Sequence, residues 1–178
     1  MTSDDVGIYY NAIHEAGHVI IALYYHLHVE AVLIKPPHTL ATRTNFNPAQ
    51  TLPCVVLGMK HAGAIAVRIQ NEALGRSDDD GFGTLDDPDS DAAWVARVTT
   101  YLTAMTMPSD AVRGTEGQMK VIVERTLREN WACVEAVARE IMKVIASGGN
   151  RIEASGIGEV LRIADPQFYG AVETYLGG

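Results

Sequence analysis

The sequence has few cysteines, no long hydrophobic run and a shortage of basic residues, and each of these features excludes a class of protein. Its 178 residues include only two cysteines, Cys54 and Cys133, far apart in the chain, which favours neither a disulfide framework nor a cysteine zinc site. The 14 Lys and Arg against 22 Asp and Glu leave a net charge of -8, whereas nucleic-acid-binding proteins usually have a basic surface. The longest apolar runs, such as VIIALYY, are too short to span a bilayer.

The N-terminus also lacks the features of a secretion signal. MTSDDVGIYY has acidic residues where a signal peptide has basic residues and then an apolar segment. We therefore expect a cytoplasmic protein with no nucleic-acid partner and no membrane partner. The remaining composition, 47% hydrophobic and 20% charged, is typical of a globular protein, and residues 1–178 are enough for a single domain with a real core.

Hydrophobic periodicity predicts a mostly α-helical fold with a small β-sheet or hairpin near the N-terminus. Two short β-branched segments, 29–34 and 40–46, predict the strands. The aspartate-rich segment that begins at Gly75 has no hydrophobic period and predicts a loop, after which Asp87 and Pro88 suit the start of a helix. The predicted helices are 5–28, 53–74, 88–107, 115–147 with a break near Asn130, and 153–164.

The motif HEAGH, residues 14–18, lies within the first predicted helix. Residues four apart on a helix differ by about 40° in direction, so His14 and His18 point the same way. Two imidazoles in this arrangement can bind one zinc ion, and Glu15 can then act as general base toward a zinc-activated water. This chemistry predicts hydrolysis of peptide bonds. The alternative is an amphipathic helix whose polar face contains two histidines.

The residues around this motif resemble the peptidase domain of the FtsH-type zinc proteases. HEAGHVIIAL resembles the zinc-binding helix of that family, and VEAVLIKPP the strand that follows it. HAGAIAVRIQ is similar to its small-residue helix, and GFGTLDDPDSDAAWVARV to the segment carrying an aspartate that serves as the third metal ligand. The resemblance covers most of the chain, with HEAGH as its specific part. It implies a zincin-like FtsH-type peptidase domain with Zn2+ as cofactor.

The chain also departs from the family pattern. No ATPase module precedes the motif and no transmembrane segment is present, so the chain resembles a stand-alone relative of the peptidase domain. Because unfolding and threading a protein need the ATPase, this resemblance implies a peptide or a flexible protein segment as substrate. The family's proteases assemble as hexamers, which leaves a homo-oligomer open here.

A catalytic zinc usually has three protein ligands, so HEAGH needs a partner. The family resemblance implies an aspartate. In a helix over 88–107, Asp91 lies four residues before Val95 and shares its buried face, whereas Asp89 points to solvent. An acid on a buried face needs a partner, and zinc would be one. We therefore predict Asp91 as the third ligand. The alternatives are another residue of the Asp86–Asp91 run and Glu72.

Three functions remain open. The first is a zinc metallopeptidase, the second a catalytically silent zincin-fold binding or regulatory domain, and the third a helical interaction module without metal. Metal content separates the third from the others, and turnover separates the first two. The predicted edge strand 40–46 can pair with an extended peptide by strand addition, or can be a plain edge with Arg43 in water. His61 is expected at the surface or behind the metal ligands.

Overall fold

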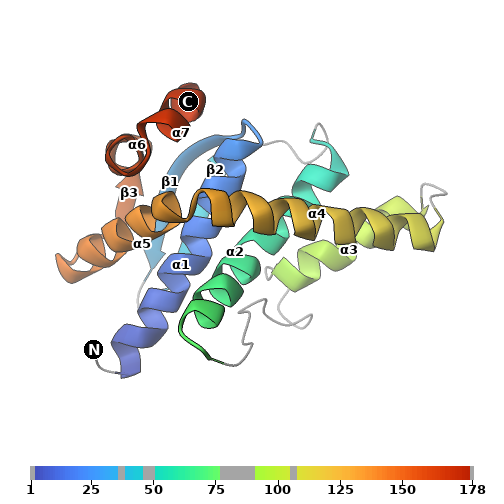
Figure 1. The fold of residues 1–178 in the computed structure, drawn as a ribbon, viewed down its shortest axis with the longest axis horizontal. Helices are drawn as coiled ribbons and strands as arrows, with labels where there is room; N and C mark the ends of the chain where they lie inside the picture. The colour runs from blue at the N-terminus through green and yellow to red at the C-terminus, as the bar shows by residue number, and fades with distance from the viewer. Residues whose placement is uncertain (1–2, 36–38, 46–50, 77–90, 105–107, 177–178) are drawn as a thin grey trace.

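The computed structural model of the chain describes residues 3–35, 39–45, 51–76, 91–104 and 108–176 (Figure 1). It is mostly helical with a small antiparallel sheet, which confirms the predicted class. Residues 88–90, where the third predicted helix was expected to begin, lie outside the described residues. The elements are α1 (Ser3–Tyr24), β1 (His28–Lys35), β2 (Thr39–Asn45), α2 (Pro53–Ala73), α3 (Asp91–Ala104), α4 (Ser109–Glu129), α5 (Trp131–Ala146), β3 (Arg151–Glu153), α6 (Ala154–Ala164), α7 (Pro166–Val172) and the 3-10 helix η1 (Glu173–Tyr175).

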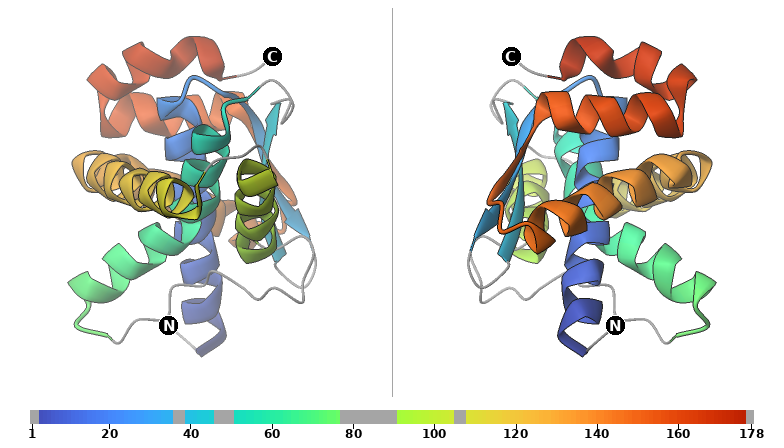
Figure 2. Two further views of the ribbon diagram at one scale, coloured as in Figure 1. Left: turned by 90° about the vertical axis from the view of Figure 1, so that its right-hand side faces the viewer. Right: turned by 90° about the vertical axis from the view of Figure 1, so that its left-hand side faces the viewer.

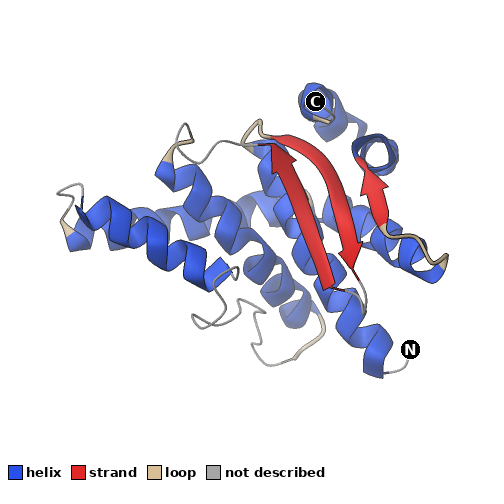
Figure 3. Ribbon diagram, turned by 180° about the vertical axis from the view of Figure 1, so that it is seen from behind, coloured by secondary structure: helices blue, strands red, loops and turns tan. Residues whose placement is uncertain are grey.

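Helix α1 is the central element of the fold. The long α4–α5 pair crosses it on one side and the sheet covers it on the other, as the two side views of Figure 2 show; Figure 3 gives the view from behind, with the sheet toward the viewer. Its apolar side chains Ile13, Ile20 and Leu23 are fully buried. A helix buried on several faces needs apolar residues almost all round, so the polar residues of HEAGH are exceptions that need partners.

Helices α1 and α2 pack closely because both carry small residues at the contact. A side chain at Gly17 would lie 2.8 Å from both the Ala62 carbonyl oxygen and the Ala66 Cβ. The small residues of α2 therefore permit the close helix contact that the sequence suggests. This contact brings the backbone of α2 beside the HEAGH turn of α1.

The first helix ends four residues earlier than the hydrophobic pattern predicts. His26 has a left-handed φ of 58°. The His26 amide donates to the Leu23 carbonyl at 2.9 Å, and the Leu27 amide donates to the Ala22 carbonyl at 2.9 Å. This pair of hydrogen bonds usually ends a helix at a glycine, so the sequence, which has a histidine there, did not signal it. The predicted break at Asn130 is confirmed, whereas α4 begins at Ser109, earlier than expected.

The sheet has the strand order β2-β1-β3, and all pairs are antiparallel. Among the described residues, strand β2 pairs only with β1, with Thr42 opposite Val32, so that its other side is an edge of the described sheet. The mostly exposed Arg43 side chain pairs across the strands with Glu30 at 2.8 Å. The short strand β3 was not predicted, because three residues give too little alternation to recognise.

The buried apolar side chains of the described residues form two clusters of very different size. The large one joins α1, the sheet, α2, α5 and α6. The small one contains Leu57 of α2, Val95 and Leu102 of α3, and Val112 of α4. In the part of the chain that the structure describes, no helix has both the length and the apolar character needed to cross a membrane.

Candidate metal centre

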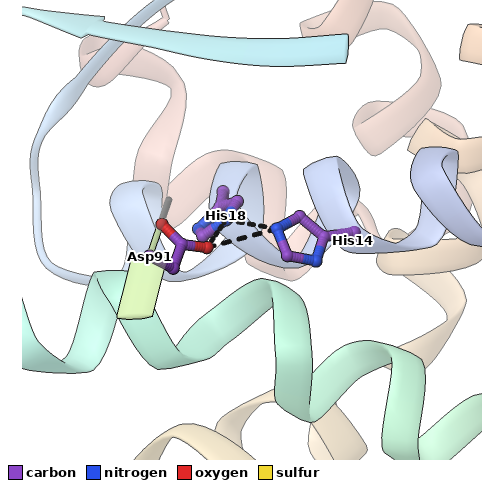
Figure 4. Close-up of side chains that lie close together, drawn as sticks. All are labelled: His14, His18 and Asp91. Carbon is purple, nitrogen blue, oxygen red and sulfur yellow. Dashed lines mark hydrogen bonds and ion pairs between the residues drawn. The ribbon is translucent and has the colours of Figure 1, made fainter. Parts of the chain in front are cut away.

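Helix α1 presents His14 and His18 one turn apart on the side that faces α2 and α3 (Figure 4). Their Nε2 atoms are 3.0 Å apart. The His14 ring lies against Gly63 of α2, where any Cβ would overlap the imidazole. Glycine at position 63 therefore leaves the space that the His14 ring occupies.

Asp91, the first residue of α3, faces both rings. Its Oδ2 atom lies 3.2 Å from His14 Nε2 and 3.0 Å from His18 Nε2. The donor atoms of the three residues all lie within 4.8 Å of one another, and the Asp91 side chain is only 10% exposed. The structure thus brings together the three residues that the sequence suggested as metal ligands, although His18 and Asp91 are 73 positions apart in the chain.

The hydrogen bond at the far side of His18 indicates which ring nitrogen carries the proton. His18 Nδ1 lies 2.8 Å from the backbone carbonyl oxygen of Met59. A carbonyl oxygen can only accept, so Nδ1 carries the hydrogen and the neutral ring has its lone pair on Nε2. Metal-binding histidines are usually held in this way by a carbonyl or carboxylate behind the ring.

Lone pairs of His18 and Asp91 therefore converge on one point beside His14 Nε2. Such an arrangement is stable only with a cation or a proton between the atoms, because acceptors facing each other repel. Two imidazole nitrogens and one carboxylate oxygen form a donor set that suits zinc. The residues present thus fit the metal that the HEAGH motif implies.

The pKa shifts of His18 and Asp91 also indicate that positive charge is needed between these residues. Burial lowers the pKa of His18, but the Asp91 carboxylate, aided by Glu15, more than reverses this effect and raises it above its usual value. Burial raises the pKa of Asp91, but His18, His14 and Lys60 together hold it well below its usual range. The carboxylate therefore stays ionised and demands positive charge beside it.

Asp91 has a further cationic partner in Lys60 of α2. The Lys60 Nζ atom lies 3.1 Å from Asp91 Oδ1, the oxygen that does not face the histidines. The same ammonium group lies 5.5 Å from the ring centroid of Trp94, one turn along α3 from Asp91. The two oxygens of Asp91 therefore have different partners.

Glu15, the proposed base, is buried against the edge strand and is 8% exposed. Its Oε2 atom accepts from the Thr42 amide at 2.6 Å and from the Thr42 hydroxyl at 2.7 Å. The Thr42 hydroxyl also lies 3.1 Å from the Glu15 carbonyl oxygen. The backbone N–H of Thr42 donates to Glu15 and not to β1. This N–H therefore points away from β1, toward the edge of the sheet.

The alternative ligands have other surroundings or lie outside the described residues. Glu72 pairs with Arg68 at 2.8 Å and also with Arg128, in a network between α2 and α4. Residues 86–90 lie outside the described residues. His61 is 3% exposed and lies 3.1 Å from Glu116, so the expectation of a surface position was wrong.

Sequence reasoning missed Lys60 and Thr42, which contact the predicted ligand Asp91 and the predicted base Glu15. A signal for Lys60 was present, since it is the one Lys, Arg, Asp or Glu among residues 53–67 of the second predicted helix, which are mostly small or apolar. For Thr42 there was none, because threonine is an ordinary residue in an edge strand.

No family model matches this chain, and a search of curated proteins also gave no match.

Proposed function

We propose that this protein is a zinc-dependent metallopeptidase of the FtsH-type, zincin-like kind. His14, His18 and Asp91 would hold the metal, and Glu15 would be the general base. The single observation that carries the proposal is the convergence of two histidine Nε2 atoms and one Asp91 oxygen, with His18 Nδ1 bound to a backbone carbonyl.

The chemistry follows from the residues around this point. When bound, zinc would polarise a substrate carbonyl and make water more acidic. Glu15, next to His14 in the chain, would take a proton from the attacking water and deliver it to the leaving nitrogen. Thr42 would hold the Glu15 carboxylate in one orientation through two hydrogen bonds. Amide hydrolysis needs each of these steps.

The surroundings favour an extended peptide as substrate. Strand β2 is the edge of the sheet, and Thr42 in this strand touches the proposed base. An extended peptide that lies along this edge would carry its backbone past the metal ligands. We therefore expect a peptide or a flexible protein segment as substrate; a cytoplasmic location and a homo-oligomer remain predictions.

A specific observation also favours the alternative, a catalytically silent zincin-fold binding or regulatory domain. One of the two Glu15 carboxylate oxygens, Oε2, already accepts two hydrogen bonds from Thr42, and the side chains of His18 and Asp91 are each only 10% exposed. A silent domain would keep the metal for structure or for binding a partner without turnover.

Metal analysis of the protein purified without chelators, together with a broad peptide-cleavage screen, tests the proposal. We expect about one zinc per chain, because three protein ligands form one site. The Glu15→Gln variant should keep the fold and the zinc but lose cleavage, because the amide cannot accept the proton. Glu129→Gln, an exposed glutamate on α4, is the matched control and should cleave like the wild type.

The outcomes separate the candidate functions. Cleavage by Glu15→Gln at the wild-type rate would show that Glu15 is not the base. Zinc binding without cleavage of any peptide would favour the silent domain. Absence of a transition metal, with no thermal stabilisation by added zinc, would reject the metal centre altogether.

A further inference from the structure

Lys60 is a partly buried cation next to the candidate metal centre, and the proposed reaction gives it no role. Its side chain is 24% exposed, and its ammonium group lies 3.1 Å from Asp91 Oδ1. The Trp94 ring, 5.5 Å away, flanks the same ammonium group. Asp91 and Trp94 both belong to the first turn of α3, so Lys60 connects α2 to the start of α3.

The two oxygens of the Asp91 carboxylate are thereby divided between two tasks. Oδ2 lies 3.0 Å from His18 Nε2 and 3.2 Å from His14 Nε2, whereas Oδ1 is bound to Lys60. An ammonium group that holds one oxygen of a carboxylate uses one of its lone pairs, which favours binding of a metal through the other oxygen. A carboxylate free at both oxygens can bind a metal through one or both.

We propose that Lys60 is a positioning residue that makes Asp91 a one-oxygen ligand. This inference rests on the proposed metal site. Holding Oδ1 aims Oδ2 at the two imidazoles and limits the protein donors to three. Three protein donors and one open position are the arrangement of a catalytic zinc site.

Lys60 has two opposing effects on metal affinity, and the direction of the change in affinity on its removal shows which effect is larger. The positive charge repels a metal cation, so its removal should tighten binding if charge dominates. The hydrogen bond orients a buried ligand, so its removal should weaken binding if positioning dominates. Partners that hydrogen-bond to metal ligands typically change metal affinity by about 10–100-fold. Positioning therefore outweighs repulsion.

The test measures zinc affinity by chelator competition and the absorption spectrum of the cobalt-substituted protein. Lys60→Met, which has a similar shape but no charge and no donor, should bind zinc about tenfold or more weakly. Its cobalt spectrum should lose intensity, because the freed second oxygen of Asp91 raises the coordination number. Lys60→Arg, which retains a charged donor, should restore both properties.

Lys143→Met on α5 is the matched control, since Lys143 is 75% exposed and its ammonium group pairs with Glu140 of the same helix. It should bind zinc like the wild type. If Lys60→Met does not fold, Lys60→Gln replaces it in the same comparison, with a smaller expected loss because the amide can still donate.

Zinc affinity of Lys60→Met equal to or tighter than that of the wild type would overturn the inference. Weaker binding with an unchanged cobalt spectrum would also overturn it, because Lys60 would then support the fold and not the ligand geometry. If the wild-type protein itself binds neither zinc nor cobalt, the proposed function fails. If the wild type binds zinc and Lys60→Met binds it equally well, the role of Lys60 is rejected and the proposed function is not affected.

Discussion

The two halves of the candidate metal centre are held in place by very different amounts of packing. His14, Glu15 and His18 belong to α1, which is packed between the sheet, α2 and the α4–α5 pair within the large core. Asp91 belongs to α3, which packs through the small cluster around Val95 and Leu102 and contacts mainly α2 and α4. The helix that carries the two histidines is therefore packed within the large core, whereas the helix that carries Asp91 packs through the small cluster.

Because of this difference, we expect the two histidines to be held more firmly than Asp91. The histidines are fixed by helix geometry and by the close α1–α2 contact, so little can alter their spacing. The position of Asp91 depends on a few apolar contacts and on the Lys60 ion pair. Changes in α3 should therefore affect metal binding at small cost in stability, and changes in α1 packing should do the reverse.

The largest expected effect compares truncations in the two clusters. Ile20→Ala, in the fully buried middle of α1, should lower the free energy of unfolding by about 4 kcal/mol, whereas Leu102→Ala in α3 should lower it by about 2 kcal/mol. Urea titrations with the metal removed measure both. Zinc affinity of the folded protein should show the opposite order, with the greater loss in Leu102→Ala. Equal losses of stability would mean that the two clusters are one cooperative core.

The next largest effect concerns the position of the His14 ring. Gly63→Ala places a methyl group where the His14 ring lies, so the ring must leave its present position. Loss of one of three ligands should weaken zinc binding on the order of a hundredfold. Gly114→Ala on α4, where a Cβ meets nothing within 4 Å, is the control and should leave zinc affinity unchanged. Wild-type zinc affinity in Gly63→Ala would show that His14 is not a ligand.

The smallest expected effect concerns His61, on the same helix as Lys60 but paired with α4. Burial, aided by Lys120, lowers the pKa of His61 despite its partner Glu116. Its folded pKa therefore lies below the unfolded value, near 6.5, so the unfolded chain binds more protons and stability is lost as pH falls below that value.

His61→Leu removes this proton uptake. Its free energy of unfolding should fall less steeply than that of the wild type between about pH 7 and 5, by less than about 1 kcal/mol in total. Denaturant titrations of both metal-free proteins at several pH values make the comparison, in which the other histidines contribute equally. A steeper fall in the variant would mean that His61 gains charge on folding.

Local sequence pattern is sufficient for much of this protein. The helical period around HEAGH places His14 and His18 on one face, and the same period places Asp91 on the face of Val95, which the structure finds buried. Asn130 interrupts a helical run, and the chain breaks there. These features depend on residues within one or two turns of each other, where backbone geometry alone relates them.

Tertiary structure alone decides the rest. The end of α1 depends on a left-handed histidine for which the sequence has no glycine signal, and β3 exists only because β1 lies beside it. The contacts of Lys60 with Asp91 and of Thr42 with Glu15 join residues 31 and 27 positions apart. Periodicity gives the direction of a side chain around its own helix or strand, but the partner it meets is set by how separate elements pack, which no local pattern records.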